Sequence, residues 1–168
     1  MSEFLLPQVL VDKAREVVDA NRAAGRKLAV AESCTGGLVC AALTEISGSS
    51  DVFEAGYVTY SNAAKCSELG VSSEVVETFG AVSVATAWAM ARGALSASEA
   101  DVAVAITGIA GPGGGTPSKP VGTVVFACAV RDADPAKIVA DQKFFEASGG
   151  RSSVRLQAAL CALDLLMP

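Results

Sequence analysis

The stretch AVAESCTGG, residues 29–37, decides the fold and contains the first candidate site. An apolar run ends at Glu32, and Ser33, Cys34 and Thr35 then lead into two glycines before a second apolar run begins. This order is typical of a buried strand, a tight turn and a helix, and it predicts a helix over roughly 35–46. The free N–H groups of such a helix start can bind an anion or a developing oxyanion.

The remaining elements are predicted to alternate along the chain as in an α/β protein. Apolar residues at helical spacing, followed by Gly25, predict a first helix over 8–24, and further helices follow the next strands. Runs rich in β-branched and aromatic residues predict the strands. The predicted strands are residues 27–33, 53–60, 101–108, 122–130 and 137–145; the other predicted helices are 62–69, 72–79, a helix beginning at Ser83, and 151–166.

The connections between these elements fix the topology. Helices separate the first three strands, which suits parallel right-handed crossovers, whereas loops alone join the third, fourth and fifth. We therefore expect a single domain over 1–168. Its fold class is α/β, with three α/β/α layers around a mixed five-stranded sheet whose fourth strand runs antiparallel to the rest.

Composition excludes several classes of protein. The formal charge of −5 without a basic cluster argues against a nucleic-acid partner. No apolar run is long enough for a membrane span, and the first residues lack a basic signal-peptide region, so we expect a cytoplasmic protein with no membrane partner. The five cysteines form no CxxC pair, and the chain contains no histidine, so no metal site is expected.

Polar and small residues gather where the parallel strands end. These segments are 32–37, 60–62 and 107–111, and ligands of open α/β sheets bind at such carboxyl ends. The glycine-rich loop 107–123 matches neither a Walker A motif nor a GxGxxG motif. We expect residues 112–120 to form a mobile loop, and Thr107, Gly108 and Gly111 to provide a backbone-lined ligand wall.

The lack of histidine rules out a Ser-His-Asp or Cys-His arrangement. Ser33 is equally compatible with a helix cap and with a nucleophile, which would need another base, and lysine is the usual substitute. Tyr60 and Lys65 lie just past the second strand, although the residues alone favour a solvated Lys65. Cys34 ranks below Ser33 because neighbouring side chains point in different directions and no histidine would generate its thiolate.

Two arginines open the last predicted helix. Arg151 and Arg155 are four residues apart and therefore lie on one helix face. They are equally compatible with a clamp on a phosphate and with two exposed charges at a helix start.

Taken together, these motifs resemble the CinA C-terminal-domain family, whose stand-alone members are nicotinamide mononucleotide deamidases. The matching stretches are AESCTGG, GSSDVFEAGYVTYSNAAK, GAVS, TGIAGPGGG, KPVGTV and GGRSSVRLQA, in the family's order over about residues 29–160. The resemblance implies hydrolysis of the carboxamide of nicotinamide mononucleotide to nicotinic acid mononucleotide and ammonia. It also implies a small-molecule nucleotide as partner, a homodimer or larger homo-oligomer, and no metal or other cofactor.

The resemblance also implies roles for individual residues. Ser33 matches the nucleophile, and Tyr60 and Lys65 match the residues that activate it. Thr107 and Gly108 match the substrate wall opposite. Arg151 matches an arginine placed for the phosphate, although Gly150 stands where many members have an aspartate.

The chemistry of this reaction suggests further contacts. The N–H groups around Thr35, Gly36 and Gly37 would form the oxyanion site, and Glu32 would face the cationic pyridinium ring. Many members carry an additional N-terminal domain with nucleotide pyrophosphatase character, and we expect that activity to be absent here. The alternatives are a non-catalytic nucleotide-binding or regulatory module linked to competence or DNA damage, and a redox sensor built on Cys34.

Overall fold

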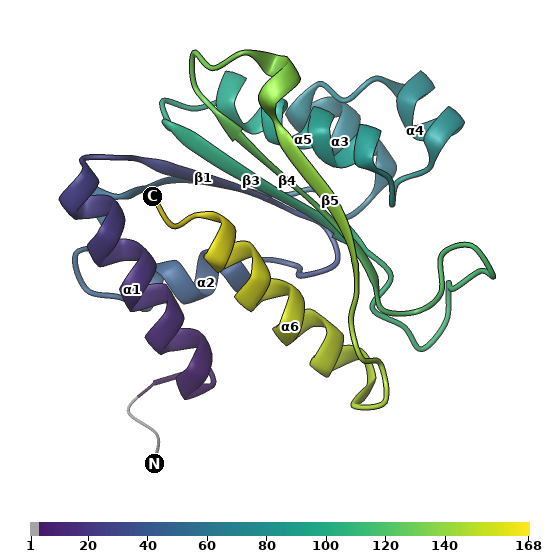
Figure 1. The fold of residues 1–168 in the computed structure, drawn as a ribbon, viewed down its shortest axis with the longest axis horizontal. Coiled ribbons are helices and arrows are strands. Elements are labelled where there is room, and N and C mark those ends of the chain that lie inside the picture. The colour runs from purple at the N-terminus through teal and green to yellow at the C-terminus, as the bar shows by residue number, and fades with distance from the viewer. Residues whose placement is uncertain (1–3) are drawn as a thin grey trace.

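The computed structural model describes residues 4–168 and contains one five-stranded sheet between two layers of helices (Figure 1). The strand order is β2-β1-β3-β4-β5. β1 pairs in parallel with β2 and β3, whereas β4 is antiparallel to both β3 and β5. The predicted layers and the reversed fourth strand are confirmed. The strands are β1 (Leu28–Glu32), β2 (Phe53–Val58), β3 (Val102–Gly108), β4 (Thr123–Val130) and β5 (Val139–Phe144).

The helices divide between the two faces of the sheet. One face is covered by α1 (Gln8–Ala24), α2 (Leu38–Thr44) and α6 (Gly150–Leu165). The other face is covered by α5 (Val84–Ser96), against which α3 (Asn62–Leu69) and α4 (Ser73–Phe79) pack. Two short 3-10 helices, η1 (Ser49–Asp51) and η2 (Pro135–Lys137), lie in connections. None of the helices formed by residues 4–168 combines the length and apolarity that crossing a membrane requires.

The two faces of the central strands differ in side-chain size. Side chains alternate between faces along a strand, and in β1 and β3 the large branched ones all point toward α1, α2 and α6. Alanines occupy the intervening positions, so α5, itself rich in alanine, packs close to the sheet. Each fully buried branched side chain contributes about 1.5–3 kcal/mol. The large residues are Leu28, Val30, Val102, Val104 and Ile106, and the alanines are Ala29, Ala31, Ala103 and Ala105.

The starts of two predicted elements are wrong for local backbone reasons. α2 begins at Leu38 rather than at residue 35, because Gly36 and Gly37 adopt φ values of 60° and 94°. Positive φ is not helical, and glycine adopts it without a steric penalty. β5 begins at Val139 because residues 135–137 form η2.

The last helix, α6, is buried on one side only. Val154, Ala158 and Leu163 are inaccessible to solvent, whereas Leu156 and Leu160 are half-exposed at the margin of the same core.

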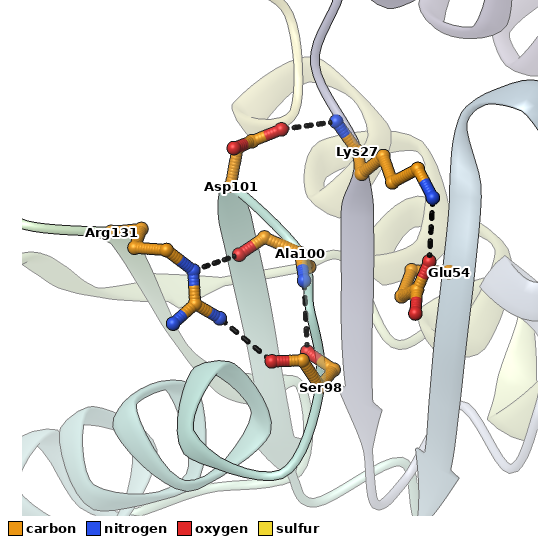
Figure 2. A network of polar contacts seen from close by, with 6 residues as sticks. All are labelled: Lys27, Glu54, Ser98, Ala100, Asp101 and Arg131. Atoms are coloured by element: carbon orange, nitrogen blue, oxygen red, sulfur yellow. Dashed lines mark hydrogen bonds and ion pairs between the residues drawn. The ribbon is translucent and has the colours of Figure 1, made fainter.

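The amino-terminal ends of β1 and β3 are joined by a polar network (Figure 2). Asp101 Oδ2 accepts from the backbone N–H of Lys27 at 2.7 Å, and Lys27 Nζ pairs with Glu54 at 3.2 Å. Arg131 Nε donates to the carbonyl oxygen of Ala100 at 2.7 Å. These contacts fix loops to strands at this end of the sheet. The candidate site lies at the opposite, carboxyl end.

Candidate active site

The carboxyl ends of the parallel strands border a cavity of about 290 Å³. The predicted convergence of the segments that follow β1, β2 and β3 is therefore present in the structure. Arg151, at the start of α6, completes the rim. The lining residues are Ser33, Cys34, Tyr60, Asn62, Lys65, Ala81, Val82, Thr107, Gly108, Ile109, Ala110, Gly111, Gly113, Gly114 and Arg151.

Lys65 is directed from α3 onto Ser33. Ser61 caps α3 by accepting from the backbone N–H of Ala64 at 3.0 Å, and Lys65 follows one turn later. Its Nζ donates to Ser33 Oγ at 2.9 Å, and the side chain is only 1% exposed. The expectation of a solvated lysine is therefore wrong.

The surroundings of Lys65 suit a neutral amine. Burial lowers the pKa of Lys65 below its ordinary value of 10.5. No carboxylate of residues 4–168 forms an ion pair with it. The carbonyl oxygens of Thr59 and Tyr60 accept from Nζ at 2.8 and 3.3 Å. When the amine is neutral, its two N–H groups can stay on these carbonyls and its lone pair faces Ser33, whose hydroxyl then donates to Nζ instead of accepting from it.

The hydroxyl of Tyr60 lies in a different set of contacts. It accepts from Nη2 of Arg151 at 2.8 Å, while Nη1 of Arg151 donates to the carbonyl oxygen of Gly111 at 2.7 Å. Among the described residues, no hydrogen bond joins the Tyr60 hydroxyl to Ser33 or Lys65. Tyr60 therefore supports Lys65 through its backbone carbonyl and orients Arg151 through its side chain.

Glu32 does not line the cavity, contrary to the expectation that it faces a pyridinium ring. It is inaccessible to solvent, and its carboxylate accepts from the N–H groups of Gly37, Val39 and Cys40 at 3.0, 3.2 and 2.9 Å. A carboxylate at a helix start satisfies these otherwise unpaired donors and interacts favourably with the helix dipole. Glu32 thus fixes the first turn of α2.

Two of the predicted oxyanion donors are already hydrogen-bonded within the turn. The N–H of Gly37 is bound by Glu32, and the N–H of Gly36 donates to the carbonyl oxygen of Ser33 at 3.0 Å. Thr35 is buried outside the cavity. The double glycine therefore shapes the turn rather than forming a cavity wall.

Replacing Glu32 by glutamine is expected to destabilise the protein by about 1–3 kcal/mol, because an amide NH₂ would face a buried N–H donor. Chemical denaturation followed by circular dichroism measures the difference. Glu54→Gln is the matched control, since Glu54 forms only a surface ion pair, and its effect should stay within about 0.5 kcal/mol. Equal stability of Glu32→Gln and wild type would contradict this role.

Arg155 does not line the cavity, because its guanidinium binds the turn after β1 instead. Its Nε and Nη2 donate to the carbonyl oxygens of Cys34 and Thr35 at 3.2 and 2.9 Å. The predicted option of a two-arginine phosphate clamp is therefore wrong, and Arg155 holds the turn that carries Ser33. Only Arg151 borders the cavity.

Cys34 both packs in the core under α2 and α6 and borders the cavity, so the expectation that it would not share a pocket with Ser33 is wrong. Burial raises the pKa of its thiol to about 11. At neutral pH the thiol is therefore almost entirely protonated and a poor nucleophile.

The far wall contains the predicted Thr107, Gly108 and Gly111. Thr107 Oγ1 donates to the carbonyl oxygen of Ala81 at 2.8 Å and so holds the 80–82 segment against the cavity. A Cβ on Gly108 would lie 2.9 Å from the carbonyl oxygen of Thr123, which explains glycine there. Asn62, which ends the predicted polar segment 60–62, also lines the cavity. Val82 does too, and its only sequence signal was its place within the stretch GAVS.

No metal ligands gather in the described chain. Among residues 4–168, no three His, Cys, Asp or Glu side chains lie close enough to hold an ion. The polar groups that line the cavity include the hydroxyl of Ser33, the amine of Lys65 and the guanidinium of Arg151.

These features define a class: α/β/α proteins with a buried lysine bonded to a serine at the carboxyl edge of a mixed sheet. The chain belongs to the CinA C-terminal domain family, whose model matches residues 11–168. It is 50% identical over 164 residues to the nicotinamide-nucleotide amidohydrolase PncC of Enterobacter agglomerans, covering 98% of this chain and 94% of that protein.

A longer relative and a solved structure point to the same family. A CinA-like protein of Mycolicibacterium vanbaalenii is 52% identical over 143 residues, which are 85% of this chain but 33% of that protein. The crystal structure of the competence/damage inducible protein CihA from Agrobacterium tumefaciens superimposes with a TM-score of 0.90 at 46% identity. That match covers 99% of this chain and 97% of CihA.

Proposed function

We propose that this protein hydrolyses the carboxamide of nicotinamide mononucleotide to nicotinic acid mononucleotide and ammonia, and so recycles pyridine nucleotides in the cytoplasm. The observation that carries the proposal is the 2.9 Å contact between Lys65 Nζ and Ser33 Oγ inside the cavity. The 50% identity to an amidohydrolase named for this substrate class supports the choice of substrate. The five free cysteines suit a reducing compartment.

In the first half of the proposed reaction, neutral Lys65 takes the proton of Ser33 as Oγ attacks the carboxamide carbon. The tetrahedral intermediate then expels ammonia, which receives that proton from Lys65, and Ser33 is left as an ester of the nicotinate group. In the second half, Lys65 removes a proton from water as the water attacks the ester, and it returns that proton to Ser33 Oγ as the serine leaves, which releases nicotinic acid mononucleotide and regenerates the hydroxyl and the neutral amine. The balance is one amide and one water giving one acid and one ammonia.

Arg151 is the proposed contact for the phosphate of the substrate. It lies at the exposed rim of the cavity, and Tyr60 and Gly111 engage only two of its five N–H donors. The remaining donors are available to phosphate oxygens, which guanidinium binds well in bidentate geometry.

Replacing Arg151 by alanine is expected to raise KM for nicotinamide mononucleotide about 10- to 100-fold. Nicotinamide riboside lacks the phosphate and should be the poorer substrate of the wild type, and its kcat/KM should be nearly unchanged by the substitution. Steady-state ammonia release on both compounds measures the effect. Arg92→Ala, which removes an arginine remote from the cavity, should behave as wild type. An equal loss on both substrates would show that Arg151 does not bind the phosphate.

The decisive experiment is ammonia release from nicotinamide mononucleotide, nicotinamide riboside and free nicotinamide, with the acid product identified by mass spectrometry. We expect turnover to be fastest with the mononucleotide. Thermal stabilisation by that nucleotide without any ammonia release would instead favour the non-catalytic binding module. Release of ammonia from none of the compounds, and no stabilisation by any, would reject the substrate class.

A further inference from the structure

β5 leaves one side of its backbone without a neighbouring strand. It is the last strand in the order and pairs only with β4. Next to the strand, the N–H of Phe145 donates to the carbonyl oxygen of Gly122 at 2.8 Å. Because backbone groups alternate in an antiparallel ladder, Asp141 and Lys143 also turn theirs toward β4. Ala140, Gln142 and Phe144 therefore direct their N–H and carbonyl groups outward.

The side chains of this strand are also exposed. Val139 and Phe144 are 62% and 63% accessible to solvent. An outer strand with large exposed apolar side chains and unpaired backbone groups is a ready template for another strand.

We propose that β5 pairs antiparallel with β5 of a second copy of this chain, about a two-fold axis that passes through Gln142. The register follows from the sequence VADQKFF, residues 139–145, because this segment is complementary to its own reverse. The facing pairs are Val139 with Phe145, Ala140 with Phe144, Asp141 with Lys143, and Gln142 with Gln142 of the second copy.

Each of these pairs is chemically matched. Asp141 meets a Lys143 of opposite charge on both sides of the axis, and opposite charges directly across two strands are stabilising. The exposed ring of Phe144 meets the small Ala140, and the two Gln142 amides can donate to and accept from one another. Moving the axis to Asp141 or Lys143 would instead oppose two identical charges.

The charged pair lies on one face of the sheet. Asp141 and Lys143 are opposite Phe126 and Val124 in the β4 ladder, and both of these belong to the core beneath α6. Within residues 4–168, neither charged residue has an ion-pair partner. In the proposed dimer, the second copy supplies each of them with a partner of opposite charge.

The geometry also matches the unpaired backbone groups. With Gln142 on the axis, the outward N–H and carbonyl groups of Ala140, Gln142 and Phe144 meet those of the same three residues in the second copy. The two sheets would join into one continuous sheet of twice the width. The alternative is that Asp141 and Lys143 keep β5 from pairing with other strands, since charged residues on an outer strand also discourage pairing.

Charge reversal separates these two roles in the full chain. Wild type is expected to sediment at twice the 16.9 kDa of one chain. In a dimer of either single variant, Asp141→Lys or Lys143→Asp, like charges would face each other at both of the 141–143 pairs. Each variant should therefore weaken dimerisation at least about tenfold. The double variant Asp141→Lys/Lys143→Asp restores both pairs and should dimerise as wild type does. An equimolar mixture of the two single variants should form a heterodimer, because its charges are again opposite.

Gln142→Pro provides a second test that leaves the charges in place. Since the N–H of Gln142 points away from β4, proline removes a contact of the dimer without breaking the β4 ladder. A folded monomer by circular dichroism and sedimentation is expected. The proposal is overturned if wild type sediments as a monomer at every protein concentration, which would leave the strand to solvent or to another protein. Single charge variants that dimerise like wild type, or a mixture that stays monomeric, would overturn it as well.

Discussion

Replacing Ser33 by alanine is expected to lower kcat for ammonia release by about 10⁴-fold or more while the protein stays folded and still binds nicotinamide mononucleotide. Ser33 Oγ is the hydroxyl to which Lys65 Nζ is bonded, at 2.9 Å, within the cavity. Without this oxygen no ester can form. The loss should appear in kcat rather than in KM, because Arg151 and the glycine wall are unchanged.

Cys34 and Ser61 provide the controls. Cys34→Ala removes the other potential nucleophile, whose thiol has a pKa raised to about 11, and should retain most of the wild-type kcat. Ser61→Ala removes a hydroxyl that only caps α3, so its effect should be a modest loss of stability. The mechanism is rejected if Ser33→Ala turns over like wild type, or if Cys34→Ala is the inactive variant.

The nucleotide itself distinguishes lost chemistry from lost folding. Wild type and Ser33→Ala should show similar increases in Tm with nicotinamide mononucleotide, since binding stabilises only the folded protein. If the alanine variant lost this increase, Ser33 would be a binding residue rather than the nucleophile.

The fold was predictable because its signals are local. The short apolar runs of β1 and β3, the glycine after α1 and the lack of a helix between β3 and β5 are each visible in short stretches of sequence. Together they determine the strand directions, because loops and helical crossovers impose different pairings. The convergence of Ser33, Lys65 and Thr107 at the carboxyl edge then follows from the parallel order of β1, β2 and β3.

The contacts that were mispredicted depend on tertiary structure. A lysine is usually exposed, and nothing within YSNAAK shows that Lys65 will be buried against Ser33. Glu32 ends a buried strand, and its use as the cap of α2 depends on the turn made by Gly36 and Gly37. Whether an N–H is free for an oxyanion is decided by such three-dimensional pairing, which residue spacing does not report.

Replacing Lys65 by methionine is expected to lower kcat/KM by about 10²–10⁴-fold, the usual contribution of a general base. Methionine fills a similar volume but cannot take the proton of Ser33. Wild-type kcat/KM should rise with pH and level off above the pKa of Lys65, because only the neutral amine accepts that proton. Lys137→Met, at an exposed lysine of η2, is the matched control and should keep the wild-type activity and pH profile.

Stability measured against pH tests the buried amine independently of turnover. The pKa of Lys65 is lowered in the folded protein, so between that value and 10.5 the unfolded chain binds a proton that the folded chain does not. The free energy of unfolding therefore gains a contribution that rises with pH across this window. Lys65→Met should lack that rise, whereas Lys137→Met should retain it. If wild type and Lys65→Met gave parallel curves, Lys65 would titrate as an ordinary lysine and could not serve as the base near neutral pH.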